Sequence, residues 1–488
     1  TDYEGYILNR SIPKHYDEYL SGRSDGQSWV KGIQITWRGL WTGTFLSFFL
    51  AIGAPYANTA MHATHMAWDF NTPGAIFLFL VLIGLLNTLF KWSSTTLNRA
   101  VIIATITALL FAVMYFYNPI DIAKPGWWLA NFLLISNIIN IFATIRGNSL
   151  ALNRSDLVLV YVMLLIVSAL CSMGMSQQLL PIISSLVYYA TPENKWQQLL
   201  GPLIPKQMIL VDDGQDNAPF FEGLGAEAQI PWQIWFEPLC WWAIFLCALY
   251  VTMISVAIIL RRQWVERERL AFPLTQVGIA MVRGESENKL LNTFLKNRIM
   301  WIGASLPLIV GSLKALHSYD PAFPVVPMTW MVPFVGNQNL QLSLFFSIVG
   351  FSYLINTHIA AGLWFFQLVS KVQSELFLIA GMRSKQTFVY GIADQPYLAY
   401  QGGGALITMV LIGLWVGREH IAGVFRKAFG FSGGISDKDE VGSYRFAVLS
   451  FLVGQIVMVS WLWLMGTKFW VAVLFIVVAL AIFVGISR

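Results

Sequence analysis

Three polar residues interrupt an otherwise apolar stretch, FSYLINTHIAAGLWFFQ, at positions 351–367. Asn356, His358 and Gln367 can all form hydrogen bonds, and such groups are costly in a membrane unless they face a cavity, the protein interior or one another. A path for a polar solute past a broken helix would need residues of this kind. Hydrogen bonds between neighbouring helices would need them too, so both interpretations stay open.

Three glutamines lie beside apolar pieces that are too short to span a bilayer alone. Gln177 and Gln178 follow the sequence CSMGMS, and Gln276 lies in the piece that comes after the charged stretch 261–269. Amides at the mouths of half-helices would contribute to the same solute path. Bonding between helices is again the alternative.

Two histidines in the sequence MHATHMAWD are three residues apart and share one helical face. His62 and His65, with Met61 and Met66 beside them, suit a soft metal such as copper, because imidazole and thioether groups bind that ion. Two histidines at the interfacial end of a helix would give the same pattern. Glycine loops for phosphate, paired-histidine zinc helices, haem attachment motifs and nucleophile elbows are missing from the sequence, so we expect neither an enzyme nor a cofactor.

Charges crowd into RRQWVERERL, residues 261–270, directly after a long apolar run. Arg262 and Glu266 are four residues apart, and Glu266 and Arg269 are three apart, so opposite charges would pair on a helix. Together with Glu268 they predict a docking face for the next segment of this chain or for a neighbouring protein. A solvated helix end with incidental pairs would look the same.

The elements that must position these residues are membrane helices. Hydrophobic residues make up 56% of the chain and charged residues only 12%, which is too little charge for a water-soluble surface. Continuous apolar runs of about 20 residues are typical of helices that cross the hydrocarbon core. We predict an all-α polytopic bundle of about 11–14 segments, including short re-entrant pieces. The predicted spans are 40–60, 74–91, 100–117, 127–145, 156–174, 238–260, 299–316, 341–370, 399–416, 444–465 and 468–486, and the short pieces are 177–190, 270–282 and 376–382.

The distribution of positive charge predicts the orientation. With the N-terminus in the cytoplasm, nearly all of the 31 Lys and Arg residues fall on the cytoplasmic side, as the positive-inside rule requires. The exceptions are Lys124, Lys195, Lys206, Lys314 and Lys468. The resulting division is a cytoplasmic segment 1–38, membrane helices 39–190, an extracytoplasmic cap 191–237 and membrane helices 238–488.

Several segments are similar to known families. WRGLWTGTFLSFFLAIGAPYANT and PGAIFLFLVLIGLLNTLFK distantly resemble the opening helix pair of the oligopeptide transporter superfamily. LNRSDLVLVYVMLLIVSALCSMGMSQQLLP, LRRQWVERERLAFPLTQVGIAM and FSIVGFSYLINTHIAAGLWFF resemble more closely an uncharacterised family of bacterial polytopic membrane proteins, over most of 150–486. The resemblances imply an oligopeptide-transporter-like bundle in the bacterial cytoplasmic (inner) membrane, with peptides or metal chelates as the substrate class.

Two functions from different classes follow from these patterns. The first is a secondary transporter-like membrane protein, which the polar interruptions and the resemblance favour. The second is a non-transporting scaffold or anchoring subunit of a larger membrane complex, which the paired charges favour. Membrane lipids are expected partners, whereas a homodimer and other protein partners are left open. Nucleic acid is not expected, because the positive residues are spread between helices.

Overall fold

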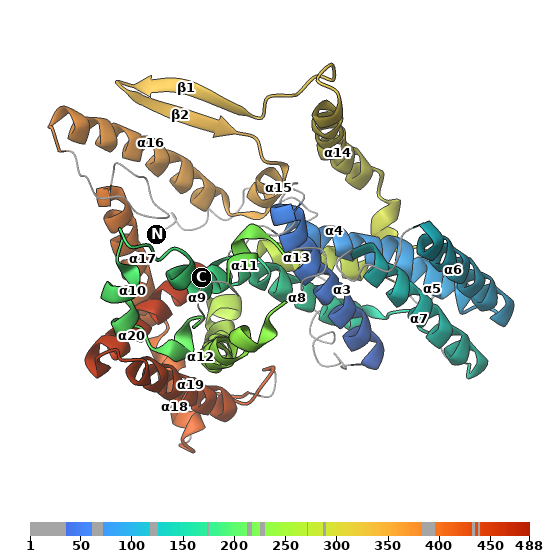
Figure 1. The fold of residues 1–488 in the computed structure, drawn as a ribbon, viewed down its shortest axis with the longest axis horizontal. Coiled ribbons are helices and arrows are strands. Elements are labelled where there is room, and N and C mark those ends of the chain that lie inside the picture. The colour runs from blue at the N-terminus through green and yellow to red at the C-terminus, as the bar shows by residue number, and fades with distance from the viewer. Residues whose placement is uncertain are drawn as a thin grey trace, which may run out of the picture. The chain divides into compact units, whose positions relative to one another are not determined.

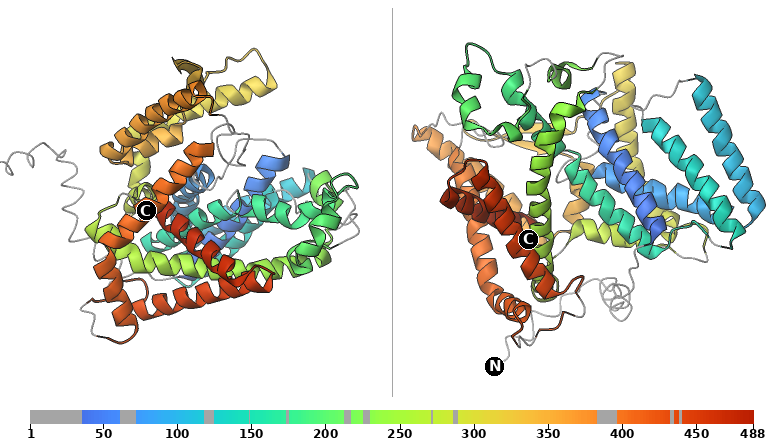
Figure 2. Two further views of the ribbon diagram at one scale, coloured as in Figure 1. Left: turned by 90° about the vertical axis from the view of Figure 1, so that its left-hand side faces the viewer. Right: turned by 60° about the horizontal axis from the view of Figure 1, so that its bottom comes forward.

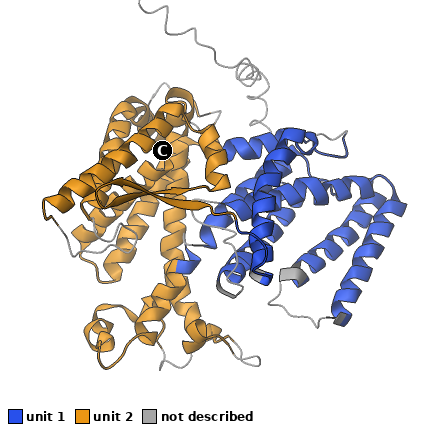
Figure 3. Cartoon of the chain, turned by 90° about the horizontal axis from the view of Figure 1, so that it is seen from above, with its two compact units in different colours: residues 1–177, 274–325 blue, residues 178–273, 326–488 orange. Residues whose placement is uncertain are grey.

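The structure, a computed structural model, describes most of the chain and divides it into two compact units (Figure 3). Unit 1 comprises Thr1–Gln177 and Leu274–Val325, and unit 2 comprises Gln178–Pro273 and Val326–Arg488. The described residues are 36–60, 72–117, 125–147, 149–172, 175–211, 217–224, 230–270, 272–285, 289–382, 396–431, 435–437 and 440–488.

Unit 1 is built from helices (Figure 1). Several begin at a residue whose side chain caps the first turn; Asn153, for example, caps the helix that follows it. The helices are α3 (Trp37–Pro55) with the π-turn η1 (Tyr56–Ala60), α4 (Pro73–Val81), the π-turn η2 (Leu82–Leu86), α5 (Asn87–Ser93), α6 (Leu97–Tyr117), α7 (Pro125–Ile145), α8 (Arg154–Leu170), α13 (Pro273–Arg283), the 3-10 turn η6 (Thr293–Lys296) and α14 (Arg298–Tyr319).

The core of unit 1 forms where α3 and α4 pack on α8. Leu50, Phe79, Leu157 and Leu164 are fully buried there. A Cβ atom on Gly39 of α3 would come within 3.2 Å of the backbone of α8, so glycine lets the two helices approach closely. Small residues at such a crossing are typical of helix packing in membranes, where the backbone itself supplies the contact.

Two further helices of unit 1, α6 and α7, pack against each other as a pair (Figure 2). The ring of Trp127 in α7 lies edge-on to Phe111 in α6, with the ring centroids 5.3 Å apart. The helix α7 also contacts α3, where the ring of Phe132 stacks on that of Phe45 with the ring centroids 3.7 Å apart. Aromatic contacts therefore join the pair to the core of the unit.

Unit 2 carries the longest described helix and the described strands. Its candidate membrane helices range from 19 residues in Phe469–Ser487 to 36 residues in Trp232–Arg267, and charged residues gather at the end of the longer one. The elements are α9 (Ser176–Tyr188), α10 (Trp196–Leu199), the 3-10 turns η3 (Gly201–Leu203) and η4 (Lys206–Met208), α11 (Ala218–Glu222), α12 (Trp232–Arg262), the π-turn η5 (Gln263–Arg267), β1 (Thr329–Val335), β2 (Gln338–Ser343), α15 (Phe346–Leu354), α16 (Thr357–Ile379), α17 (Pro396–Val416), α18 (Arg418–Ala428), α19 (Tyr444–Leu464) and α20 (Phe469–Ser487).

The core of unit 2 forms along α12 and α19. A Cβ atom on Gly454 of α19 would lie 3.1 Å from the backbone carbonyl of Ala248 in α12, so this crossing also depends on glycine. The indole Nε1 of Trp461 donates to the carbonyl of Trp241 at 2.9 Å. The amphipathic helix α18 adds Val424 to the same core.

The segment between α9 and α12 packs on both of these helices. Leu210, Ile183 and Trp235 form a buried apolar cluster, and the backbone N–H of Leu210 donates to the carbonyl of Ile183 at 3.0 Å. The amide of Asn217 donates to the carbonyl of Ser184 at 2.7 Å. The described parts of this segment are therefore folded, whereas their place on the outer side of the membrane stays a prediction.

A β-hairpin, which the sequence analysis did not predict, precedes α15. β1 and β2 pair antiparallel, with Thr329 opposite Ser343, and a bulge lies between Pro333 and Val335. Gly336 has a φ of +52° in the connecting turn, where glycine avoids strain. The hairpin occupies the beginning of the predicted span 341–370.

The remainder of that span is broken at Asn356. α15 ends at Leu354, and the side chain of Asn356 caps α16 by accepting a hydrogen bond from the backbone N–H of His358 at 3.0 Å. The length of the apolar stretch 341–370 allows either one tilted helix or a helix broken near Asn356, and the structure has the break. The predicted short piece 376–382 was wrong as a separate element, because α16 continues to Ile379.

Within the described residues, eight helices are long and apolar enough to cross a membrane. They correspond to predicted spans. The predicted span 127–145 forms the 21-residue helix α7, of which Leu129–Ile145 is the apolar part that the structure describes, and the predicted span 156–174 forms the 17-residue helix α8. The chain is thus a helical, multi-pass membrane protein, with fewer complete spans among the described residues than the sequence analysis predicted.

Candidate functional site

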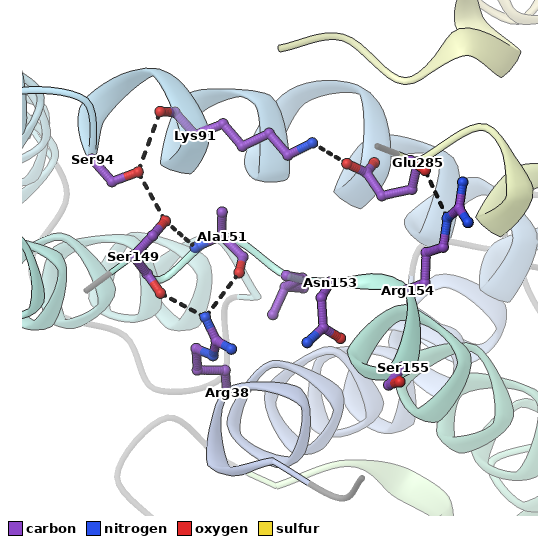
Figure 4. A pocket seen from close by; sticks show the side chains of 10 residues that line it. Arg38, Lys91, Ser94, Ser149, Ala151, Asn153, Arg154, Ser155 and Glu285 are labelled. Carbon is purple, nitrogen blue, oxygen red and sulfur yellow. Dashed lines mark hydrogen bonds and ion pairs between the residues drawn. The ribbon is translucent and has the colours of Figure 1, made fainter. Parts of the chain in front are cut away.

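A polar pocket of about 730 Å³ lies at the ends of α3, α5 and α8 in unit 1 (Figure 4). We call it the polar pocket and define it by the charged residues Arg38, Lys91, Arg154 and Glu285, the serines Ser94, Ser149 and Ser155, and Asn153. Three cationic side chains and one carboxylate line it, so its lining carries net positive charge.

Arg38, at the start of α3, binds the loop that precedes α8. Its Nη1 donates to the carbonyl of Ser149 at 2.7 Å and to that of Ala151 at 3.2 Å. Its Nη2 lies 4.0 Å from the carboxylate of Asp156. The guanidinium therefore holds the loop on one side and approaches a buried acid on the other.

Asp156 is completely buried and belongs to the N-terminal cap of α8. Its Oδ2 accepts from the backbone N–H of Asn153 at 3.1 Å, while Asn153 accepts from the N–H of Asp156 at 2.9 Å, which makes a capping box. The hydroxyl of Thr36 also donates to this carboxylate. The charge is therefore satisfied by backbone and side-chain donors together.

Glu285 is the carboxylate that lines the polar pocket, and it is buried. Lys91 of α5 forms an ion pair with it, and the amide of Asn292 donates to its Oε2 at 3.3 Å. Arg154 donates through Nε to the backbone carbonyl of Glu285 at 2.8 Å. Figure 4 shows Lys91 and Arg154 pointing at Glu285 from different elements, so this residue ties α5 and α8 to the loop after α13.

Uncharged partners fix the remaining wall of the pocket. Asn87 of α5 is buried and bonds both backbone groups of Leu152, accepting from its N–H at 2.7 Å and donating to its carbonyl at 3.3 Å. The hydroxyls of Ser94 and Ser149 lie 2.9 Å apart. The loop 149–153 is therefore bound along its length, and the polar pocket has a preformed wall.

The sequence analysis counted Arg38, Lys91 and Arg154 only in the distribution of positive charge that predicts the orientation, and it did not consider Glu285 or Asp156. Asn153 and Asp156 do carry a local signal, because their spacing is that of a capping box before an apolar run. Arg38, Lys91 and Glu285 carry none, since each comes from a different part of the chain.

The structure places the predicted solute-path residues of α16 at its exposed surface. Asn356 and His358 are exposed at the break, and Gln367 lines a second pocket of about 410 Å³ between β2 and α16. We call this the hairpin pocket; Gln341, Ser343 and Lys371 also line it. Their role in a solute path stays a prediction.

The three other predicted glutamines do not share this pocket. Gln177 and Gln178 lie in the first turn of α9, and the backbone N–H of Gln177 donates to the carbonyl of Ser172 at 3.2 Å. Gln276 is exposed on α13. The predicted metal ligands His62 and His65 lie outside the described residues, among which no group of three or more His, Cys, Asp or Glu could hold a metal ion.

The charged stretch after α12 pairs within unit 2. Arg262 and Glu266 form an ion pair at 2.9 Å, as their four-residue spacing predicts. Glu268 pairs instead with Arg488 at 2.9 Å. The predicted pairing of Glu266 with Arg269 on one helix was wrong, because η5 ends at Arg267 and Arg269 adopts a left-handed φ of +54°.

A buried histidine that the sequence analysis missed lies beside this stretch. His420 of α18 is 1% exposed, and its Nε2 lies 2.9 Å from the carbonyl of Ile259. Burial lowers the pKa of His420, and the nearby Arg267 and Arg262 lower it further, although the hydrogen bond to Ile259 opposes this. Burial therefore favours the neutral form of the imidazole, which makes a structural contact with α12.

Apolar helices with polar pockets at their ends define a multi-pass membrane protein rather than a soluble one. The chain belongs to a family of unknown function, DUF6785, whose model matches residues 96–488. No curated protein and no solved structure matches it. The matched residues include Ser149–Ser155 and Glu285 of the polar pocket, whereas Arg38, Lys91 and Ser94 precede them.

Proposed function

We propose that the protein is a secondary transporter-like carrier, and not an enzyme, in the bacterial cytoplasmic membrane, with its N-terminus inside. Its proposed substrates are peptides or metal chelates. The observation that carries this proposal is the broken helix at Asn356: α15 ends at Leu354, α16 begins at Thr357, and the polar side chains of Asn356 and His358 are exposed at the break.

The first half of the broken helix is too short to span a membrane. α15 has nine residues, which is about 14 Å at 1.5 Å per residue, against a hydrocarbon core of roughly 30 Å. The N-terminus of α16 carries the partial positive charge of a helix end. In secondary transporters, such half-helix ends face the substrate, because irregular backbone is tolerated in a membrane only beside protein or a water-filled cavity.

The hairpin pocket supports the same function. Gln341 and Ser343 of β2 face Gln367 and Lys371 of α16 across a cavity of about 410 Å³. Amide, hydroxyl and ammonium groups match the carbonyls and carboxylates of a peptide or of a chelating ligand. The ends of a solute path would need groups of this kind.

A second candidate function is a scaffold or anchoring subunit, and a different observation favours it. In the most apolar stretch of α14 none of the residues is buried within the protein, and in that of α17 only 6% of the residues are buried. Lipid would cover such helices, and so would another protein. The charged stretch after α12 no longer favours this candidate, because Glu268 pairs with Arg488 of the same chain.

Uptake into liposomes tests the transporter function. The purified chain is reconstituted, and the entry of labelled peptides and of metal chelates is measured for Asn356→Ala, Asn356→Ser and Gln367→Ala. Serine retains the helix cap but lacks the amide, so the pair separates a cap effect from a solute contact. Ser352→Ala is the matched control, because the hydroxyl of Ser352 bonds only to its own helix among the described residues.

We expect uptake by the unchanged protein and by Ser352→Ala, with at least a tenfold loss in Asn356→Ala and Gln367→Ala, an estimate for lost substrate hydrogen bonds. Uptake that none of the substitutions alters would remove the broken helix from the solute path. Extraction in mild detergent with native mass determination separates the two functions: a lone monomer or homodimer favours the carrier, and stoichiometric partner proteins favour the scaffold.

A further inference from the structure

The register of the β-hairpin determines which backbone groups β2 presents at its outer edge. The backbone N–H of Leu344 donates to the carbonyl of Met328 at 2.8 Å, so these residues form a hydrogen-bonded pair. Opposite residues of an antiparallel hairpin alternate between hydrogen-bonded and non-hydrogen-bonded pairs, so Thr329 and Ser343, the next pair, are not bonded to each other through the backbone. By the same alternation, the N–H and carbonyl groups of Gln341 and Ser343 point away from β1.

The described part of the chain leaves this edge unpaired. Among the described residues, none hydrogen-bonds to the outward backbone groups of Gln341 and Ser343. The outer edge of β1 is less complete, because Pro333 has no N–H to offer there. An open sheet edge is not tolerated against lipid, so we expect the edge of β2 to face water or to be covered by a ligand.

The hairpin pocket extends along this edge. Residues 340–343, four in succession, all line it, and its opposite wall is α16, which lies beside the hairpin (Figure 1). Successive side chains of a strand point to opposite faces, so a cavity that all four residues line follows the edge rather than one face. The four residues span about 10 Å at roughly 3.4 Å per residue. With its volume of about 410 Å³, the cavity suits a ligand of about three extended residues.

Lys371 of α16 supplies an ammonium group to the pocket. It is half-buried, it is the charged residue among the lining residues, and it forms no ion pair or hydrogen bond with another described residue. The acid of α16, Glu375, is buried one helical turn further on and accepts a hydrogen bond from Gln338. Because Glu375 reduces the local net charge, the pocket has no general excess of positive charge. Selective binding must therefore come from direct contact with Lys371 together with the strand edge.

The contacts between β2 and α16 determine the direction in which a ligand would run. Gln338 at the start of β2 bonds Glu375, whereas the later residues 340–343 share the pocket with the earlier residues 364–371. The strand and the helix therefore run in opposite directions. Lys371 precedes Glu375 by about 6 Å along the helix, so it lies beside the beginning of the strand. A ligand with its carboxylate at Lys371 would run antiparallel to β2.

We propose that the hairpin pocket binds a short peptide in an extended conformation, as a third strand antiparallel to β2. The backbone groups of Gln341 and Ser343 bond the main chain of the peptide, and the ammonium of Lys371 contacts its terminal carboxylate. Main-chain bonds of this kind do not depend on the side chains of the peptide. This inference rests on the proposed function, because it selects peptides over metal chelates as the substrate class of the same pocket.

Isothermal titration calorimetry of the full chain in detergent tests the contact with Lys371, without any movement of solute. The probes are trialanine with a free carboxylate and trialanine amide. We expect the free acid to bind at least about tenfold more tightly than the amide, because only the acid can pair with the ammonium. Lys371→Gln should bind the two probes equally. Lys468→Gln is the matched control, because Lys468 is an exposed lysine that does not line the pocket, and it should bind like the unchanged protein.

Gln341→Pro tests the strand edge. Proline removes the outward N–H but no hydrogen bond of the hairpin, and Pro333 occupies the equivalent position in β1. Gln341→Ala removes the same side chain and retains the N–H, so the difference between the two variants isolates the backbone group. We expect Gln341→Pro to bind trialanine at least about fivefold more weakly than Gln341→Ala, with melting temperatures to compare their folding.

The proposal is overturned if trialanine does not bind, if its amide binds the unchanged protein equally well, or if Gln341→Pro binds like Gln341→Ala. A dimer that Gln341→Pro separates in native mass determination would assign the edge to a second copy of the chain and would overturn it too. Peptide binding as expected without uptake in liposomes supports this inference and removes the proposed transport. Uptake of metal chelates without peptide binding supports the transport and removes this inference.

Discussion

Glu268 and Arg488 form an ion pair although 220 residues separate them in the chain. Oε2 of Glu268 lies 3.0 Å from Nε and 2.9 Å from Nη2 of Arg488, and its Oε1 accepts from the amide of Gln263 at 3.0 Å. Nη1 of Arg488 also donates to the carbonyl of Met409 in α17 at 3.1 Å. One arginine therefore joins the residue that follows η5, the end of α20 and the middle of α17.

We predict that Glu268→Gln lowers the stability of the protein by about 1–3 kcal/mol, because a partly buried arginine loses its counter-charge. Thermal unfolding in detergent measures the change. Glu266→Gln is the control from the same stretch, and it should cost less than about 1 kcal/mol, since the side chain of Glu266 is 47% exposed. Equal losses of stability in the two variants would show that the ion pair with Arg488 contributes no more to stability than the exposed ion pair of Glu266.

Gly454→Val should destabilise the packing of α19 on α12. Its side chain would meet the hydroxyl of Thr252 and the carbonyl of Ala248, so the helices must separate at a cost of about 1–3 kcal/mol. Gly403→Ala in α17 is the matched control, because the space around that glycine is open among the described residues. Alanine there should be neutral or slightly stabilising. A stable Gly454→Val protein would contradict the close crossing.

His420 should make the stability depend on pH below about 6.5, its unperturbed pKa. Its folded-state pKa is lowered, so the unfolded chain binds the proton more readily, and stability is lost as the pH falls below that value. His420→Gln can retain a donor to the carbonyl of Ile259 and does not titrate. Melting temperatures between pH 5 and 8 should therefore fall less steeply toward low pH in this variant, and parallel curves would exclude His420 as the cause.

Glu375→Ala should loosen the β-hairpin. The buried carboxylate of Glu375 packs against Gly336 in the turn and accepts a hydrogen bond from Gln338 at 3.4 Å, so it joins the hairpin to α16. A two-stranded hairpin is barely stable alone, so its amide hydrogens should exchange faster without this contact. Gln373→Ala is the control two residues away. Unchanged exchange in Glu375→Ala would show that other contacts hold the hairpin.

Much of the fold could be predicted from the sequence because apolar runs are local signals. Hydrophobicity alone indicates the eight long apolar helices. The break at Asn356 is indicated by a residue type that often caps helices, which here interrupts an apolar stretch. The hairpin was missed although Gly336 and Asn337 separate two short strands, because the last residues of β2, from Gln341 to Ser343, were assigned to the predicted span 341–370. α18 was missed because it is amphipathic and too polar for a span.

The candidate site was harder to predict, because its residues meet only in the folded chain. Arg38 and Asp156 belong to different helices, and Lys91 forms an ion pair with Glu285, from which 194 residues separate it in the sequence. A single sequence shows each of these charges at the end of an apolar run, where topology alone explains it. The charged stretch 261–269 could be recognised in the sequence, but nothing in the sequence indicated that Arg488 would pair with it.

The interleaving of the two units has a consequence for how the protein is made. Residues 178–273 of unit 2 emerge from the ribosome before residues 274–325, which complete unit 1 and bring Glu285 to the polar pocket. α12 is synthesised long before α19, its main packing partner. We therefore expect the lipid bilayer or an insertion factor to hold α12 while translation continues. No cut at a single place in the chain separates one complete unit from the other.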